Sequence, residues 1–340
     1  MKKRIVLSGY FGFRNFGDEA ILSVLVNKLQ QNRNRLTIIT SDPEYTKSLY
    51  SHIRVIKTFD FHNIIAAIYK SDILISGGGS LLQDVTSLKS LIYYLLIIFI
   101  GLFFRKKVII FAQGIGPIKS QLGQFLTKSI IKNCSYISVR DKKSQELLKE
   151  WGIKSDLLCD PIFSVNISPK EKTKTVAIQL RDCKGMNMDF LDRLADAVCR
   201  NFRDYNIDIY SFQDSIDLEI CKTFENKIKI LNPEIKTKLY NDLTNMQIIE
   251  NLNNAQYLIS MRFHAIIIGL LSGIKTLGIN YDIKVEKLAK EFGLPLIDIK
   301  NDFGNAFEYI KSQNLKEINE KVTNKNFDWS GFDKIIKGND

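Results

Sequence analysis

The chain has 340 residues, enough for about two domains of ~150 residues each. Its 45% apolar and 25% charged residues are typical of a globular protein with a sizeable core. The formal net charge of +11 indicates an anionic partner, but the lysines are spread along the chain and no basic run is interleaved with aromatic residues, which argues against nucleic acid.

The cysteines indicate a reducing compartment. There are five of them, an odd number, and no two form a CxxC pair. This favours free thiols and a cytoplasmic location over a disulfide framework. The basic start of the chain precedes an apolar run of only about five residues, which we interpret as a first strand and not as a secretion signal.

Short apolar strands alternate with longer amphipathic segments in the first half of the chain. This alternation predicts βαβ units and a mostly parallel sheet. Strands are expected at residues 3–10, 35–41, 53–59, 72–78, 107–113 and 136–141, with helices such as 20–31 and 122–133 between them.

One segment is unusually apolar. Residues 91–104 read LIYYLLIIFIGLFF and are followed by Arg105, Lys106 and Lys107. The run is shorter than the ~20 residues that span a bilayer. Two interpretations stay open: a helix buried against the sheet, or a helix partly embedded in the inner face of the cell membrane, so that residues 91–107 contact anionic lipid.

A polar stretch without hydrophobic periodicity, residues 164–175, contains Pro169 and predicts a linker. We therefore expect an N-terminal domain at 1–165, a linker at 166–175 and a C-terminal domain at 176–340. Strands are expected at 175–182, 207–213, 235–240, 257–261 and 275–281, and helices at 246–255, 263–273 and 285–293. The predicted fold is α/β, with two Rossmann-like domains whose parallel sheets face across a cleft. The helical tail from about residue 306 is assigned to the second domain, although the sequence does not say which domain it packs against.

Candidate site residues follow the strands, because open parallel sheets bind ligands beyond the carboxyl ends of their strands. Glycines there allow close approach to a backbone, and cationic groups suit a phosphate or carboxylate. Each feature also has a structural explanation, as a turn, a helix cap or a packed histidine. In the first half the candidates are Gly12, Asn15, Gly17, Asp18, Glu19, Gly77, Gly78, Gly79, Ser80, Gln83, Asp84, Gln113, Gly114 and Arg140, and in the second half Arg262, His264, Asp282 and Lys284.

Familiar cofactor motifs do not fit. The chain has no GxxxxGK[ST], no complete GxGxxG, no HExxH and no serine nucleophile elbow. We therefore expect no metal and no separate cofactor. For the triple glycine of ISGGGSLLQD we predict that a ligand lies against the backbone of Gly77 to Gly79.

The segments GYFGFRNFGDEAIL, SGGGSLLQDVTS, AQGIGPI, VRD and MRFHA occur in order between residue 9 and about 284. Together they resemble the polysaccharide pyruvyltransferase family, especially its bacterial cell-wall members. Two positions depart from that pattern: Ile283 stands where proline is expected, and Arg14 occupies a usually small position. Neither change removes a chemical group, though Arg14 could alter the choice of acceptor.

The resemblance implies a GT-B-like pair of domains and transfer of pyruvate from phosphoenolpyruvate onto two hydroxyls of one sugar. It further implies a 4,6-ketal on an N-acetylmannosamine unit of a lipid-diphosphate-linked glycan precursor. On this analogy Arg140, His264 and Lys284 form the donor site, with His264 as acid or base. Asp18, Glu19 and Asp84 are candidates for binding the acceptor or for the second proton transfer, and Gln83 and Asp84 are expected to reach sugar hydroxyls.

Two other functions stay open. A GT-B glycosyltransferase would share the two-domain layout and bind a nucleotide sugar, since a fold does not determine a function. A non-catalytic anion-binding protein would keep the cleft and lose the chemistry.

Overall fold

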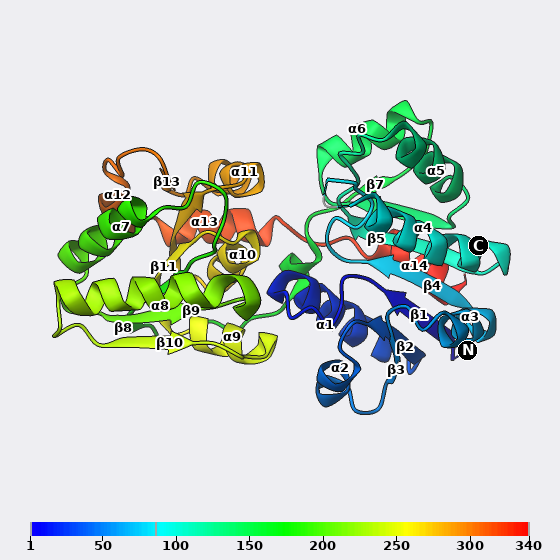
Figure 1. Cartoon of the computed structure of the whole chain (residues 1–340), viewed down its shortest axis with the longest axis horizontal. Coiled ribbons are helices and arrows are strands. Elements are labelled where there is room, and N and C mark those ends of the chain that lie inside the picture. The colour runs from blue at the N-terminus through cyan, green and yellow to red at the C-terminus, as the bar shows by residue number, and fades with distance from the viewer. Residues whose placement is uncertain (1, 86, 339–340) are drawn as a thin grey trace. The chain divides into compact units, whose positions relative to one another are not determined.

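The computed structural model describes residues 2–85 and 87–338 and divides into two compact units (Figure 1). Unit 1 comprises Met1–Ser164 and Asn326–Asp340, and unit 2 comprises Val165–Lys325. In each unit parallel strands alternate with helices, which confirms the predicted α/β class with two Rossmann-like sheets. That the sheets face across a cleft stays a prediction.

Among the described residues, unit 1 has a seven-stranded sheet in the order β3-β2-β1-β4-β5-β6-β7, with every neighbouring pair parallel. The central strands are buried almost throughout, as expected where helices cover both faces of a parallel sheet. Its strands are β1 Arg4–Ser8, β2 Arg35–Thr40, β3 Arg54–Lys57, β4 Ile73–Gly77, β5 Lys107–Gln113, β6 Tyr136–Val139 and β7 Asp156–Leu157. Its helices are α1 Phe16–Gln30, α2 Pro43–Leu49, α3 Phe61–Lys70, α4 Leu88–Phe103, α5 Gln121–Ile131, α6 Lys142–Glu150, the 3₁₀ turn Pro161–Ser164 and α14 Ser330–Lys337.

The described part of unit 2 forms a six-stranded parallel sheet in the order β10-β9-β8-β11-β12-β13. Its strands are β8 Thr173–Gln179, β9 Asn206–Tyr210, β10 Thr237–Tyr240, β11 Ala255–Ser260, β12 Lys275–Asn280 and β13 Leu296–Asp298. Its helices are α7 Met188–Asn201, α8 Asp214–Leu231, α9 Asn245–Leu252, α10 Phe263–Leu271, α11 Ile283–Phe292, α12 Ala306–Ser312 and α13 Leu315–Thr323. Strand β8 begins inside the stretch predicted as a linker, because Thr173 already pairs with Ala255.

The predicted boundary at 176–340 assigned the C-terminal segment to the second domain, but this segment packs with unit 1. Residues from Asn326 onward pack with unit 1. The physical reason is an aromatic cluster: the rings of Phe327, Trp329 and Phe332 lie 5.5, 5.4 and 5.1 Å from the ring of Phe111 on β5. Phe111 and Phe332 are fully buried as a result. Burying aromatic side chains of this size outweighs the cost of ordering a short terminal segment.

Candidate functional site

The carboxyl ends of β1, β4, β5 and β6 lie side by side in the sheet of unit 1. The loops that leave them carry the candidate residues of the first half. Register explains the grouping: Ser8 at the end of β1 pairs with Ser76 of β4, and Gly77 pairs with Phe111 of β5. Parallel pairing therefore gathers these loops at one edge of the sheet.

The glycine run approaches protein groups. Gly77 ends β4, and a Cβ placed on it would lie 2.9 Å from Leu25. Gly78 and Gly79 have positive φ angles of +87° and +57°, and a Cβ on Gly79 would lie 2.4 Å from Oδ1 of Asp18. Glycine is thus required here for its left-handed backbone and for the close packing of the Asp18 carboxylate. That a ligand also lies against this backbone stays a prediction.

Two adjacent acidic side chains open helix α1. Asn15 caps the helix by accepting a hydrogen bond from the Gly17 N–H, and the Asp18 and Glu19 side chains are both buried. Oε1 of Glu19 accepts a 2.6 Å hydrogen bond from the N–H of Gly12. Burial raises the pKa of Glu19 to about 8, and the neighbouring Asp18 charge adds to the rise. Glu19 is therefore mostly protonated at neutral pH.

Three other candidates in unit 1 hold the loops together. The two carboxylate oxygens of Asp84 accept the N–H groups of Lys119 and Ser120, at 2.8 and 2.7 Å, and these hydrogen bonds lower the Asp84 pKa. Oε1 of Gln83 accepts from Val85 N–H at 2.6 Å. Gln113 is fully buried and donates to Oγ of Ser76 at 2.9 Å.

Arg140 lies just after β6, in an ion pair that the sequence did not predict. Its Nη1 lies 2.7 Å from Oδ2 of Asp160, and its Nη2 donates to Oγ of Ser80 at 3.3 Å. The exposed fractions of the two charged side chains are 9% and 2%. A Cβ on Gly114 would lie 2.5 Å from the same Ser80 Oγ. Arg140, Ser80 and Gly114 therefore meet, and Asp160 fixes the orientation of the guanidinium.

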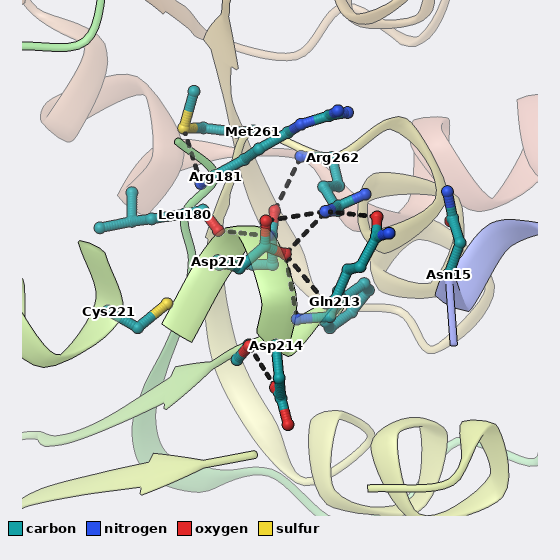
Figure 2. Close-up of polar contacts among 12 residues, drawn as sticks. Asn15, Leu180, Arg181, Gln213, Asp214, Asp217, Cys221, Met261 and Arg262 are labelled. Carbon is teal, nitrogen blue, oxygen red and sulfur yellow. Dashed lines mark hydrogen bonds and ion pairs between the residues drawn. The ribbon is translucent and has the colours of Figure 1, made fainter. Parts of the chain in front are cut away.

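In unit 2 the corresponding edge contains a buried ion pair, shown in Figure 2. Arg262 follows β11, and its Nε and Nη2 donate to the two carboxylate oxygens of Asp217 on α8, at 2.9 and 2.7 Å. Oδ2 of Asp217 also accepts the N–H groups of Phe212 and Gln213. Asp217 is fully buried and Arg262 is 6% exposed. The charge of Arg262 is thus balanced inside the protein.

His264 and Lys284 lie in the first turns of two helices that follow adjacent strands. His264 belongs to α10, where its half-buried imidazole packs edge-on against Phe263, with the ring centroids 5.2 Å apart. Asp282 caps α11 by accepting the Lys284 N–H at 2.9 Å. The Lys284 side chain is exposed. Because β11 and β12 are neighbours, the two basic side chains leave the same edge of the sheet.

Arg181 is a further cation at this edge, and the sequence reasoning missed it. It follows β8, next to β11 in the sheet, and its Nη1 donates to the Tyr281 hydroxyl at 3.4 Å. The guanidinium carbon lies 5.8 Å from the centre of the Tyr281 ring. The segment TVAIQLRD places Arg181 after a strand, which is the same signal that singled out Arg140. Asp160 and Asp217 had no comparable signal, because each lies far along the chain from its arginine.

The described residues hold no group of three or more His, Cys, Asp or Glu side chains that could bind a metal ion. The five cysteines carry free thiols. Of the helices in residues 2–85 and 87–338, none is long and apolar enough to cross a membrane.

Comparison with solved structures shows the fold. The chain is similar to Anabaena HepE in complex with UDP and glucose, with a TM-score of 0.61, 12% identity and coverage of 99% of each chain. It is similar to a glycosyltransferase from Rickettsia africae, with a TM-score of 0.61 and 14% identity over 100% of this chain and 97% of the other. It is also similar to a UDP-GlcNAc 2-epimerase from Methanocaldococcus jannaschii, with a TM-score of 0.63 and 10% identity over 99% of both chains.

No curated protein matches the sequence significantly. The family model described as polysaccharide pyruvyl transferase matches residues 15–283, which include all the loops described above except the start of the β1 loop and the residues from Lys284 onward. The match covers well over half of the chain and confirms the resemblance inferred from the sequence. The chain therefore belongs to the polysaccharide pyruvyl transferase family.

Proposed function

We propose that the protein transfers pyruvate from phosphoenolpyruvate to two hydroxyls of one sugar, forming a ketal and releasing phosphate. Membership of a transferase family supports this proposal. In its finer form, the acceptor is a lipid-diphosphate-linked cell-wall or exopolysaccharide precursor, and the ketal is 4,6-linked on N-acetylmannosamine. Phosphoenolpyruvate serves as substrate, with no separate cofactor.

The observation that carries the proposal is a set of basic side chains after three adjacent strands of unit 2: Arg181 after β8, His264 after β11 and Lys284 after β12. Arg181 contacts the neutral Tyr281 hydroxyl and ring. Unlike Arg262, which is balanced by Asp217, it therefore retains its positive charge for a ligand. Phosphoenolpyruvate carries a phosphate and a carboxylate on one carbon, so its site needs clustered donors of this kind.

The chemistry requires a proton carrier. In the proposed sequence an acid protonates the methylene carbon of phosphoenolpyruvate, and a sugar hydroxyl adds to C2 and loses its proton. The C2–O bond to phosphate then breaks with its electron pair on phosphate, and the second hydroxyl attacks C2 and loses its proton. We assign His264 to the first proton transfer, since histidine is the side chain most often used as a general acid or base. Such transfer contributes 10²–10⁴-fold in rate. Arg181 and Lys284 stabilise the negative charge on the leaving phosphate.

Unit 1 carries a separate set of candidate groups at its own sheet edge. Asp18 packs on Gly79 beside Ser80, and we assign it to an acceptor hydroxyl. Glu19 is buried and bound to the Gly12 N–H, so we assign it the role of positioning the Gly12 loop. Arg140 stays a catalytic candidate, with its guanidinium held by Asp160.

A second candidate function is transfer of a sugar from a nucleotide sugar. The specific observation in its favour is the likeness of fold to HepE, which was solved with UDP and glucose. It predicts affinity for UDP-glucose, whereas the pyruvyl proposal predicts affinity for phosphoenolpyruvate.

Calorimetric titration of the full chain with each ligand separates the two candidates. We expect binding of phosphoenolpyruvate, at least tenfold weaker binding in Arg181→Gln, and unchanged binding in Arg200→Gln, whose side chain is exposed on α7. His264→Gln is expected to lose turnover and to keep most of the affinity. Binding of UDP-glucose without any binding of phosphoenolpyruvate would contradict the proposal.

A further inference from the structure

Helix α4 presents an apolar stripe to the outside of unit 1. Leu88, Ile92, Leu96, Phe99 and Phe103 recur at intervals of three or four residues, and their exposed fractions are 36, 41, 39, 49 and 69%. Such spacing places side chains on one face of a helix. The opposite face is buried, so tightly that a Cβ on Gly101 would lie 2.6 Å from Leu74 of β4. The interpretation as a helix buried against the sheet therefore holds for one face of α4, and contact of the exposed face with a membrane stays a prediction.

Neighbouring helices extend this stripe into a patch. On α5, Leu122 and Phe125 are 55 and 67% exposed, and this helix packs so closely on α4 that a Cβ on Gly123 would lie 3.1 Å from Leu91. On α3, Tyr69 is 61% exposed, and its ring lies 5.3 Å from that of Phe104, the residue that ends α4. We call the exposed side chains of α4 with Leu122, Phe125 and Tyr69 the α4 face. Apolar side chains that are exposed together on neighbouring helices mark an interaction site.

The stretch of chain that contains α4 and α5 carries charge of one sign. Between Asp84 and Asp141 the sequence contains no Asp or Glu, although the whole chain carries 37 of them in 340 residues. The same stretch contains eight basic residues: Lys89, Arg105, Lys106, Lys107, Lys119, Lys128, Lys132 and Arg140, of which Arg140 is held in the buried ion pair with Asp160. Lys106 lies over the ring of Tyr69, with its Nζ 5.7 Å from the ring centroid. Lys106 therefore borders the apolar side chains of the α4 face.

We propose that the α4 face docks on the surface of an anionic lipid bilayer. Its apolar side chains enter the headgroup and acyl boundary, while the surrounding lysines and arginine contact the headgroups. A second copy of the chain fits less well, because it would bring the same cations against themselves. Helix α4 has 16 residues, too few to span the hydrocarbon core, so it lies along the surface. This inference does not depend on the proposed reaction.

Vesicle co-sedimentation of the full chain tests the docking. We expect binding to vesicles of phosphatidylglycerol and phosphatidylethanolamine, and at least tenfold weaker partitioning into phosphatidylcholine vesicles. The double variant Phe99→Ser and Phe103→Ser should lose at least tenfold on anionic vesicles. The control, Ile230→Ser and Leu231→Ser, removes equally exposed apolar side chains from α8 and should bind like the native protein.

Two results would overturn the proposal. One is equal binding of both double variants, which would make the attraction purely electrostatic. The other is a dimer that the α4 substitutions dissociate in the absence of any vesicle binding, which would make the face a contact between copies. Insertion has its own readout: a Phe99→Trp side chain should be quenched by lipids brominated on their acyl chains, whereas Ile230→Trp should not. Absence of quenching in Phe99→Trp would also contradict docking.

Discussion

Glu19 predicts an unusual dependence of stability on pH. Its pKa in the folded protein is about 8, against an ordinary value of 4.5. Below pH 4.5 both states are protonated. As the pH rises from 4.5 to 8 the unfolded chain loses its proton while the folded protein keeps it, so the free energy of unfolding falls, and above 8 it levels off. At 1.36 kcal/mol for each pKa unit, the full loss is on the order of 4 to 5 kcal/mol.

The perturbation is Glu19→Gln, which keeps an oxygen to accept the Gly12 N–H and cannot ionise. The variant should unfold like the native protein at pH 5 and should be more stable than it at pH 9, by up to several kcal/mol. Both tryptophans, Trp151 and Trp329, belong to unit 1. Their fluorescence during urea unfolding therefore reports on the unit that contains Glu19.

The matched control is Glu150→Gln, an exposed glutamate on α6 of the same unit. Other titratable groups contribute equally to the native protein and to both variants. The quantity that decides is the difference in unfolding free energy between Glu19→Gln and the native protein. If that difference stays constant from pH 5 to pH 9, Glu19 is not protonated in the folded state and the reasoning fails.

Three further predictions concern other parts of the chain. Asp217→Asn leaves a buried guanidinium without its carboxylate, so we expect the free energy of unfolding of unit 2 to fall by about 3 kcal/mol, measured by urea unfolding followed by circular dichroism. The control Asp189→Asn removes an exposed ion pair on α7 and should lower that free energy much less. Equal losses in the two variants would contradict the argument. Phe332→Ala removes a fully buried ring from the cluster on Phe111 and should lower the free energy of unfolding of unit 1 by about 3 to 5 kcal/mol, measured by tryptophan fluorescence. A fall in that free energy of less than about 1 kcal/mol would show that the C-terminal segment does not stabilise unit 1. Gly79→Ala forces a Cβ against Asp18 at a positive φ and should lower the melting temperature of unit 1. The control Gly152→Ala also has a positive φ but has open space around its Cβ, so it measures the cost of the backbone conformation alone. An equal fall in melting temperature in both variants would exclude the Asp18 contact as the cause.

Much of this fold was predictable because local signals and tertiary structure agree. The strand expected at 107–113 is β5 with the same bounds, and Asn15 and Asp282 cap helices where a polar residue follows a strand. The alternation of strand and helix determined the parallel sheets. Short strands were missed, such as β7 with two residues, because so few residues show no periodicity.

The positions of the candidate site residues could be predicted from the sequence, but the residues that form ion pairs with them could not. Strand ends locate Arg140 and Arg262, but Asp160 and Asp217 neutralise them from 20 and 45 positions away in the chain. Long-range pairing of this kind follows from packing, which periodicity does not encode. The same limit explains the tail, whose aromatic residues indicate burial without indicating the surface that buries them.

The return of the chain to β5 of unit 1 makes unit 2 an insertion within unit 1. During translation, residues 1–164 emerge first, but the rings that cover Phe111 arrive only after the whole of unit 2 has been synthesised. At 5–20 residues per second that delay is roughly 10 to 35 s. During that time the C-terminal rings do not yet cover Phe111 on β5. Unit 1 is therefore the first unit to be synthesised and the last to be completed.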